Sequence, residues 1–291
     1  MTKRYAYDEA AFDTGEVTIN YAVAGDPDRP AVLLVPALAE SWWGYERAMT
    51  LLAEDFQVFA VDLRGHGRST RTPGRYTFDN AGNDLVRFIA GRIGRPVLVS
   101  GASAGGVVAA WLSAYAPPGM IRAAALEDAP LFAAEADPPF GPLWMLLHKH
   151  LGGQWSIGDW AGLYEAARHE LPPGLSGILG TDPATPPRRL AEWDPEWGLA
   201  FTTRTAGASC DHARMLSAVR VPVLFMHNFR QVDESTGALR GAISDAQARR
   251  AGDLVSAAGQ RFDYRSFPDA AHRMHEADPA RFVATLREWA A

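Results

Sequence analysis

The sequence lacks several features that would define other classes of protein. Its single cysteine, Cys210, excludes a disulfide within the chain and suits a reducing compartment. No apolar run reaches the ~18 residues that a membrane-spanning helix requires, and the opening MTKRYAYDEA has no apolar stretch typical of a signal peptide. We therefore expect a cytoplasmic protein that does not associate with membranes.

Other absences limit the partners and cofactors. The 291-residue chain has a formal net charge of -6 and no run of basic residues, so nucleic acid is not an expected partner. It has no His-Glu-x-x-His pattern, no paired cysteines and no glycine-rich dinucleotide fingerprint, so we expect neither a metal nor another cofactor. The oligomeric state stays open, a homo-oligomer included. With 47% hydrophobic residues, the chain can bury one large core, or a core and a smaller lobe.

Short apolar runs alternate with segments of helical spacing over most of the chain. Strand patterns occur at 16–25, 31–36, 58–63, 96–101, 121–130, 221–227 and 261–267, and helical patterns at 77–94, 106–116, 244–258 and beyond Asp278. Asp278 can cap the last helix and Pro279 suits its first position. This alternation predicts an α/β fold, with a mostly parallel central sheet flanked by helices.

The alternation stops between residues 131 and 215. This segment has many prolines and no clear strand pattern, and it holds five of the nine tryptophans: Trp144, Trp155, Trp160, Trp193 and Trp197. We expect residues 1–130 and 216–291 to form the core and residues 131–215 to form an inserted helical cap. An apolar cap of this kind favours a bulky neutral substrate.

A serine between two glycines follows the strand pattern at 96–101. In VLVSGASAGG (97–106), Gly101 and Gly105 flank Ser103, and a helical pattern comes next. A strand-Gly-x-Ser-x-Gly-helix sequence makes a sharp turn that raises the serine above the sheet, and side chains at the glycines would clash with the neighbouring strand or helix. The amide of Ala104 then points, with the helix N-terminus, at a developing oxyanion. Ser103 is the candidate nucleophile.

With this turn and three further motifs, the chain resembles the α/β-hydrolase superfamily over nearly its whole length. The motifs are LLVPALAESWWGYE, DLRGHGRS, GASAG and FPDAAHRMHEADPARF. The resemblance implies an α/β-hydrolase fold, a cap after the sixth strand and a triad in the order serine, acid, histidine. Pro36-Ala37 replaces the usual His-Gly of the oxyanion loop, but that loop acts through backbone amides. Alignment of the loop implies that the amide of Leu38 pairs with that of Ala104.

The same resemblance assigns the histidines near the C-terminus. His272 follows RSFPDAA, the loop where the superfamily places its general base, which takes the proton of Ser103 and returns it to the leaving group. His275 fits a second histidine that is often packed beneath this loop, and His66 has a structural place in the Arg-Gly-His-Gly turn. We expect His272 to be the base.

The acid is the unusual member of the expected triad. The usual position, in the loop after 221–227, holds Gln231, whose neutral amide cannot offset an imidazolium charge. Glu127 and Asp128 lie at the tip of the preceding strand pattern, and alternation sends their side chains in opposite directions. We favour Asp128 because it is nearer the tip, and we keep Asp233 and Glu127 as alternatives.

An acid at this position, in LEDAP, resembles that of the zearalenone lactonases, α/β-hydrolases that open a resorcylic macrolactone. The resemblance implies a serine hydrolase that cleaves a carboxylic ester, favouring a lactone of a bulky apolar substrate, through an acyl-enzyme. Trp42, Trp144 and Trp193 are the candidate substrate contacts. A hydrolase of diketone C–C bonds and a non-catalytic ligand-binding relative are the alternatives.

Overall fold

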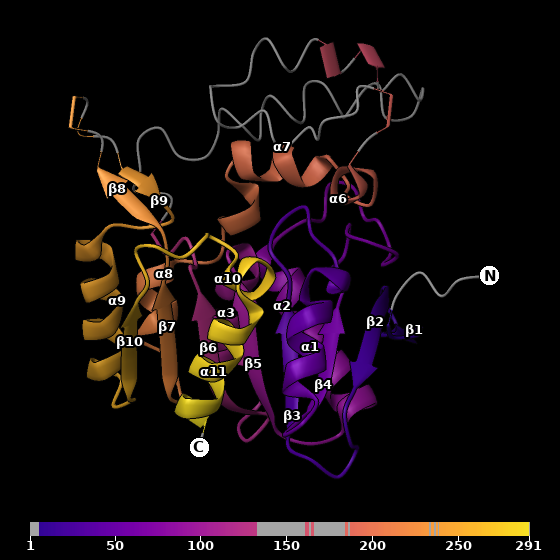
Figure 1. Cartoon of the computed structure of the whole chain (residues 1–291), viewed down its shortest axis with the longest axis horizontal. Helices are drawn as coiled ribbons and strands as arrows, with labels where there is room; N and C mark the ends of the chain where they lie inside the picture. Colours follow the sequence, from indigo (N-terminus) through magenta and orange to yellow (C-terminus); the bar gives the residue numbers. More distant parts are fainter. Residues whose placement is uncertain are drawn as a thin grey trace.

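The structure is a computed structural model of the chain, shown in Figure 1. It describes residues 6–132, 161–162, 164–165, 184–185, 187–232, 234–235, 237 and 239–290. None of the helices in these ranges is long and apolar enough to cross a membrane.

One eight-stranded sheet forms the centre of the molecule, in the order β1-β2-β4-β3-β5-β6-β7-β10. Its strands are β1 (Glu9–Asp13), β2 (Thr18–Ala24), β3 (Ala31–Val35), β4 (Gln57–Val61), β5 (Val97–Ala102), β6 (Ile121–Glu127), β7 (Val223–His227) and β10 (Phe262–Ser266). The pairs β1–β2 and β2–β4 are antiparallel, and the strands from β4 to β10 pair in parallel. The predicted α/β-hydrolase fold with a mostly parallel sheet is therefore confirmed.

The central strands are buried on both faces, which explains their continuous apolar runs. In β3, Leu33 and Val35 pack into one core cluster, and Val32 and Leu34 pack into another on the opposite face. The alternation follows from strand geometry, because successive side chains point to opposite faces of a sheet. Two helical layers are needed to cover such a sheet.

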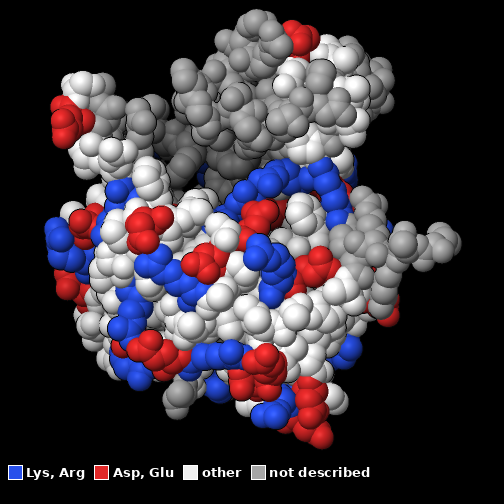
Figure 2. Space-filling view, in the orientation of Figure 1, with Lys and Arg blue, Asp and Glu red and all other residues white. Residues whose placement is uncertain are grey.

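The helices form those two layers. The first layer consists of α2 (Phe78–Phe88), α3 (Ala104–Tyr115), α8 (His212–Leu216) and α9 (Asp245–Ala257). The second layer, on the opposite face of the sheet, consists of η1 (Trp42–Tyr45), α1 (Glu46–Leu52), α10 (Met274–Ala277) and α11 (Pro279–Ala290). In Figure 1, α1 and α11 lie in front of the sheet. Figure 2 shows acidic and basic side chains intermingled on this face, where Arg287 at 2.7 Å from Glu54 ties α11 to the end of α1.

Side-chain caps define several helix starts. The side chain of Thr77 accepts from the amide of Asn80 at the start of α2, and Ser244 and Gln247 form a capping box on α9. The last helix begins at Pro279 as predicted, and Asp278 accepts a hydrogen bond from the Arg281 amide (3.1 Å). The α2 helix continues as η2 (Ile89–Ile93), a π-helical turn that ends at a left-handed glycine. The periodicity did not predict β1, α10 or the small hairpin of β8 (Arg230–Val232) and β9 (Leu239–Gly241).

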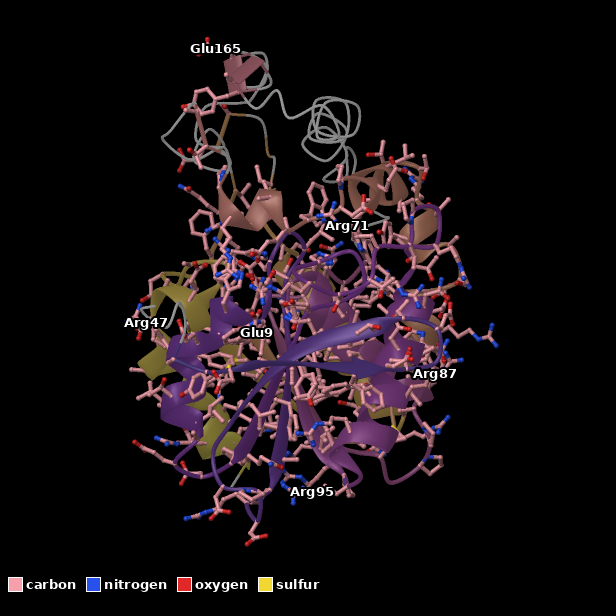
Figure 3. The ribbon with its side chains drawn as sticks, turned by 90° about the vertical axis from the view of Figure 1, so that its right-hand side faces the viewer. Glu9, Arg47, Arg71, Arg87, Arg95 and Glu165 are labelled. Carbon is pink, nitrogen blue, oxygen red and sulfur yellow. The ribbon has the colours of Figure 1, made fainter. Side chains whose placement is uncertain are left out.

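Part of the predicted cap segment is described. It comprises α6 (Arg188–Ala191), α7 (Glu196–Thr202), η5 (Thr205–Gly207) and α8. In Figure 1, α6 and α7 lie over the carboxyl ends of the strands. Trp193 forms a backbone bridge with His66, and the indole of Trp197 donates to the Arg64 carbonyl (2.8 Å). Arg71, labelled in Figure 3, lies at this boundary and donates to the carbonyl of Ala191 (3.4 Å).

Candidate active site

Ser103 lies at a strained turn between β5 and α3. Its backbone has φ 52° and ψ −121°, a left-handed conformation that is rare for a residue with a side chain. A Cβ on Gly101 would lie 2.1 Å from the Gly105 carbonyl oxygen, and one on Gly105 would lie 2.4 Å from that of Pro36. Both glycines are therefore needed for the turn to pack against β3 and α3, as the sequence pattern predicts.

The candidate oxyanion hole lies between this turn and the loop after β3. Ala104 is the first residue of α3, where backbone amides have no partner within the helix. In the loop after β3, Leu38 is half-buried, and the next residue, Ala39, has a φ of 56°. The two amides are placed by the two elements that the sequence analysis assigned to them, and their role in binding an oxyanion stays a prediction.

His66 supports the oxyanion loop. Burial lowers the pKa of His66 to about 4, so the imidazole is neutral. Its Nε2 accepts the Ala39 amide proton (3.2 Å), which leaves Nδ1 as the donor to the Arg64 carbonyl (3.1 Å). The neutral tautomer therefore satisfies both neighbours, in keeping with the structural place that the resemblance gave this histidine.

Asp128 follows the last residue of β6 and contacts His272. Its Oδ2 lies 2.6 Å from Nδ1 of His272, and its Oδ1 accepts the backbone amide of Asn228 (3.1 Å). The carboxylate is fully buried, and the backbone has a φ of 46°, which turns the residue out of the strand. The structure thus brings together Asp128 and His272, two of the three predicted triad members.

The environment of His272 favours its protonated form. Burial lowers the pKa of His272, but the hydrogen bond and charge of Asp128, together with the charge of Glu127, outweigh this effect and leave the pKa above its ordinary value. The imidazole side chain is 45% exposed, so one edge stays accessible. Because Nδ1 faces Asp128, Nε2 is the nitrogen that can exchange a proton with a serine hydroxyl.

Asn228 is a site residue that the sequence analysis missed. It is fully buried at the end of β7, and its side-chain Nδ2 donates to the carbonyls of Ala271 (3.1 Å) and His272 (3.3 Å). Its backbone amide meanwhile donates to Asp128. One residue thus holds both the acid and the loop of the base. The only signal in the sequence was its position after β7, where the usual acid loop begins.

Glu127, the neighbour of Asp128, contacts a different histidine. Both of its carboxylate oxygens accept from His275, Oε1 from the backbone amide (3.0 Å) and Oε2 from Nδ1 (2.8 Å). Both side chains are fully buried. The structure therefore gives Glu127 no contact with His272 and places His275 beneath the loop, where the resemblance expected it.

The tips of three neighbouring strands are joined by backbone hydrogen bonds. The amide of Ser103 donates to the Glu127 carbonyl (2.8 Å), and the amide of Asp128 donates to the Met226 carbonyl (2.8 Å). The ladder of the sheet thus continues one residue beyond β5 and β6. The positions of the serine turn and the acid are fixed relative to each other by the backbone rather than by a flexible loop.

The remaining candidates differ in placement. Trp42 is fully buried in the core, and its indole donates to Glu9 (2.8 Å), the first residue of β1, which is labelled in Figure 3. This packing leaves it no free surface, so we no longer consider Trp42 a substrate contact. Trp193, between α6 and α7, is equally buried, so the same reasoning applies to it. Gln231 is exposed on β8, and Trp144, Trp155, Trp160 and Asp233 lie outside the described residues.

Among the described residues, no group of three or more His, Cys, Asp or Glu side chains could hold a metal ion.

The sheet topology, with a glycine-flanked serine turn beside a buried acid-histidine pair, is that of the α/β-hydrolase fold. Residues 30–151 match the family described as alpha/beta hydrolase fold.

Curated relatives match part of the chain. The 3-oxoadipate enol-lactonase 2 of Acinetobacter baylyi is 28% identical over 102 residues, which cover 35% of this chain and 38% of the relative. The AB hydrolase superfamily protein YfhM of Bacillus subtilis is 26% identical over 137 residues, 46% of this chain and 48% of the relative. The chain thus matches less than half the length of these two proteins.

Solved structures match the whole fold. The enol-lactonase from Burkholderia xenovorans has a TM-score of 0.66 at 18% identity, covering 96% of this chain and 99% of that one. Est816, described as an N-acyl homoserine lactone degrading enzyme, has a TM-score of 0.68 at 18% identity, covering 96% and 100%. At these identities the similarity shows the fold.

Proposed function

We propose that the chain is a serine hydrolase of carboxylic esters, and that its favoured substrate is a lactone of a bulky apolar compound, as in the zearalenone lactonases. The observation that carries the proposal is the 2.6 Å contact between Asp128 and His272 beside the strained turn of Ser103. The lactonases named among the relatives and similar structures support the substrate class.

The proposed reaction uses each of these groups in turn. Ser103 attacks the ester carbonyl while Nε2 of His272 takes its proton, and Asp128 stabilises the imidazolium that forms. The amides of Leu38 and Ala104 stabilise the oxyanion of the tetrahedral intermediate. His272 returns the proton to the leaving alcohol, and a water activated by His272 then releases the acid from the acyl-enzyme. With a lactone, the alcohol and the acid leave as one product.

We also propose that residues 131–215 cover this site as a cap. Support comes from α6, where Glu192 accepts from the indole of Trp43 (2.9 Å) and from Ser41 (3.4 Å), both just after the oxyanion loop. The guanidinium of Arg188 lies 4.7 Å from the ring centroid of Trp43. These contacts fix the described part of the segment to the edge of the site, so an aromatic enclosure for a bulky substrate is consistent with the fold.

The test is turnover of a panel of lactones, linear esters and a vinylogous diketone by the wild type and by Ser103→Ala. We expect hydrolysis of a bulky lactone, and a fall in kcat of roughly 10⁶-fold in the variant, the scale on which loss of a triad nucleophile acts. Retention of more than about a tenth of the activity would exclude Ser103 as the nucleophile. Turnover of the diketone alone would favour the C–C hydrolase, and no turnover with retained ligand binding would favour a non-catalytic relative.

A further inference from the structure

A second group of titratable side chains lies beneath the proposed triad, and no step of the proposed reaction uses it. It consists of His275, Glu127 and Glu40, and the exposed fractions of their side chains are 0%, 0% and 4%. Burial of two carboxylates is costly unless each charge is compensated. The arrangement around His275 indicates how the compensation is made.

Each ring nitrogen of His275 faces one carboxylate. Nδ1 lies 2.8 Å from Oε2 of Glu127, and Nε2 lies 3.9 Å from Oε2 of Glu40. Neither Nε2 of His275 nor Oε2 of Glu40 has a hydrogen-bond partner among the described residues. A carboxylate facing the lone pair of a neutral imidazole would be repelled, whereas it attracts an N–H of the protonated ring.

The other charged and titratable groups around His275 leave this pairing intact. The Arg273 guanidinium pairs with Glu40 and lies 2.9 Å from Glu276. Arg189 of α6 lies 3.8 Å from Glu276, so that carboxylate has its own partners. The Tyr45 ring stacks on His275 with centroids 3.9 Å apart, and burial keeps the pKa of its hydroxyl well above the ordinary value, so Tyr45 stays neutral. Arg273 thus supplies one positive charge beside the two buried carboxylates of Glu40 and Glu127.

We propose that Glu40, His275 and Glu127 form a buried carboxylate–imidazolium–carboxylate bridge that positions the oxyanion loop against the loop of the base and offsets the charge of Glu127 at His272. This inference rests on the proposed function of the site above it. His275 supplies the missing positive charge, with both ring nitrogens protonated. It acts as a positioning residue, since it is fully buried and three residues from the base.

The bridge joins three segments whose relative positions the proposed reaction depends on. Glu40 is two residues from Leu38, Glu127 is adjacent to Asp128, and His275 is on the same loop as His272. The charge of Glu127 raises the pKa of His272, so the imidazolium beside Glu127 sets how much of that charge His272 experiences. Loss of the bridge should therefore alter both the geometry of the oxyanion hole and the titration of the base.

The decisive experiment is NMR titration of the His272 imidazole in the wild type, His275→Gln, Glu127→Gln and the double variant. Removal of the imidazolium exposes the charge of Glu127, so the pKa of His272 should rise in His275→Gln by up to about one unit. It should fall in Glu127→Gln and return close to the wild-type value in the double variant. In the same His275→Gln protein, kcat should fall about 10-fold to 100-fold with a smaller change in KM, because the oxyanion donor moves.

His227 provides the matched control, since it is equally buried, and burial lowers its pKa so that it carries no charge. His227→Gln should lower stability and leave the titration of His272 unchanged. A purely structural role of His275 would give the same result for His275→Gln, and this would overturn the proposal. Because the titration needs no substrate, it holds or fails independently of the proposed hydrolysis.

A second variant covers the case in which His275→Gln does not fold. Glu40→Gln keeps the shape of the side chain and removes its charge, so the ¹⁵N shifts of His275 should change from those of an imidazolium to those of a neutral ring. A neutral His275 in the wild-type protein at pH 7 would overturn the proposal directly.

Discussion

Asp128 and Glu127 are adjacent carboxylates, and each is paired with a histidine, yet the two pairs occupy different environments. The Asp128–His272 pair has a 2.6 Å contact and a base that is 45% exposed. The Glu127–His275 pair has a 2.8 Å contact, and both members are fully buried. The contact distances differ little, so access to the surface, and not the contact itself, separates a pair suited to chemistry from one suited to structure.

The backbone explains how neighbours reach such different places. Glu127 is the last residue of β6 and points to one face of the sheet, whereas Asp128 has left the strand with a φ of 46°. A left-handed conformation in a residue with a side chain is strained by about 1–3 kcal/mol. The hydrogen bonds of Asp128 to Met226, Asn228 and His272 hold it there.

The largest effect on kcat should come from replacing the carboxylate of the exposed pair, that of Asp128, with an amide. Asp128→Asn should lower kcat by roughly 10⁴-fold, because the base loses its counter-charge and its preferred tautomer, with little change in stability. Glu127→Gln should lower kcat far less, by about 100-fold at most, and should destabilise the fold more because it unbalances a buried pair. Steady-state kinetics and urea unfolding of both variants measure the two effects. A smaller loss of kcat in Asp128→Asn than in Glu127→Gln would reverse the roles of the two carboxylates.

Asn228 connects the exposed pair to the sheet, and removing its amide should have the next largest effect. Asn228→Ala keeps the backbone bond to Asp128 and removes the two bonds to the His272 loop, so kcat should fall about 10-fold to 100-fold through misplacement of the base. The matched control is Asn80→Ala, since Asn80 donates to the carbonyl of Arg75 (2.8 Å) far from the site. Equal kinetics for the two variants would show that Asn228 does not position the base.

The pH dependence of activity reports the charge at the exposed pair. The general base must be neutral to act, and the pKa of His272 is raised, so the acidic limb of kcat/KM should lie above the ordinary histidine value of about 6.5. Asp128→Asn should move this limb to lower pH, because the charge that raises the pKa is gone. Asp269→Asn removes an exposed carboxylate of the same loop, paired with Arg281 at 2.9 Å, and should leave the limb in place. A limb that stays fixed in Asp128→Asn would mean that another group controls it.

The smallest effect should come from Tyr45, which stacks on the buried pair. Tyr45→Phe keeps the ring and loses the hydrogen bonds of its hydroxyl with the Val35 carbonyl (3.1 Å) and with the Ala102 backbone, so we expect a loss of about 0.5–1.5 kcal/mol per bond in unfolding free energy and unchanged kinetics. Tyr45→Leu removes the stacking as well and should cost more. A stability loss in Tyr45→Phe as large as in Tyr45→Leu would assign the support of His275 to the hydroxyl.

The fold could be predicted largely from local patterns. The buried parallel strands read as short apolar runs, and the glycines of the serine turn are required by contacts of 2.1 Å and 2.4 Å that any Cβ would make. The choice of Asp128 followed from Gln231 at the usual acid position, together with the order of strands in the sheet. The fold could be predicted because it depends on neighbours in sequence and on a regular topology, while the role of Asp128 as the acid stays a prediction.

Other site features depend on pairings between distant residues, which a single sequence does not contain. Glu127 and His275 are 148 residues apart, and Asn228 reaches the His272 loop 44 residues away. Trp42 was misjudged for the same reason, because the sequence could not show that Glu9 accepts its indole proton and that the core encloses it. Propensity and periodicity identify which face of an element is apolar, but not which polar atoms meet across the molecule.

With Asp128, directly after β6, as the proposed acid, the loop after β7 has no catalytic duty in the proposed reaction. In the proposed triad, Gln231 stands where a carboxylate would otherwise be required, exposed on the short β8–β9 hairpin. Asn228, at the very start of this connection, donates its backbone amide to Asp128. On this proposal, sequence change beyond Asn228 leaves the proposed triad unchanged, so the hairpin offers evolution, or an engineer, a place to exchange or lengthen a loop.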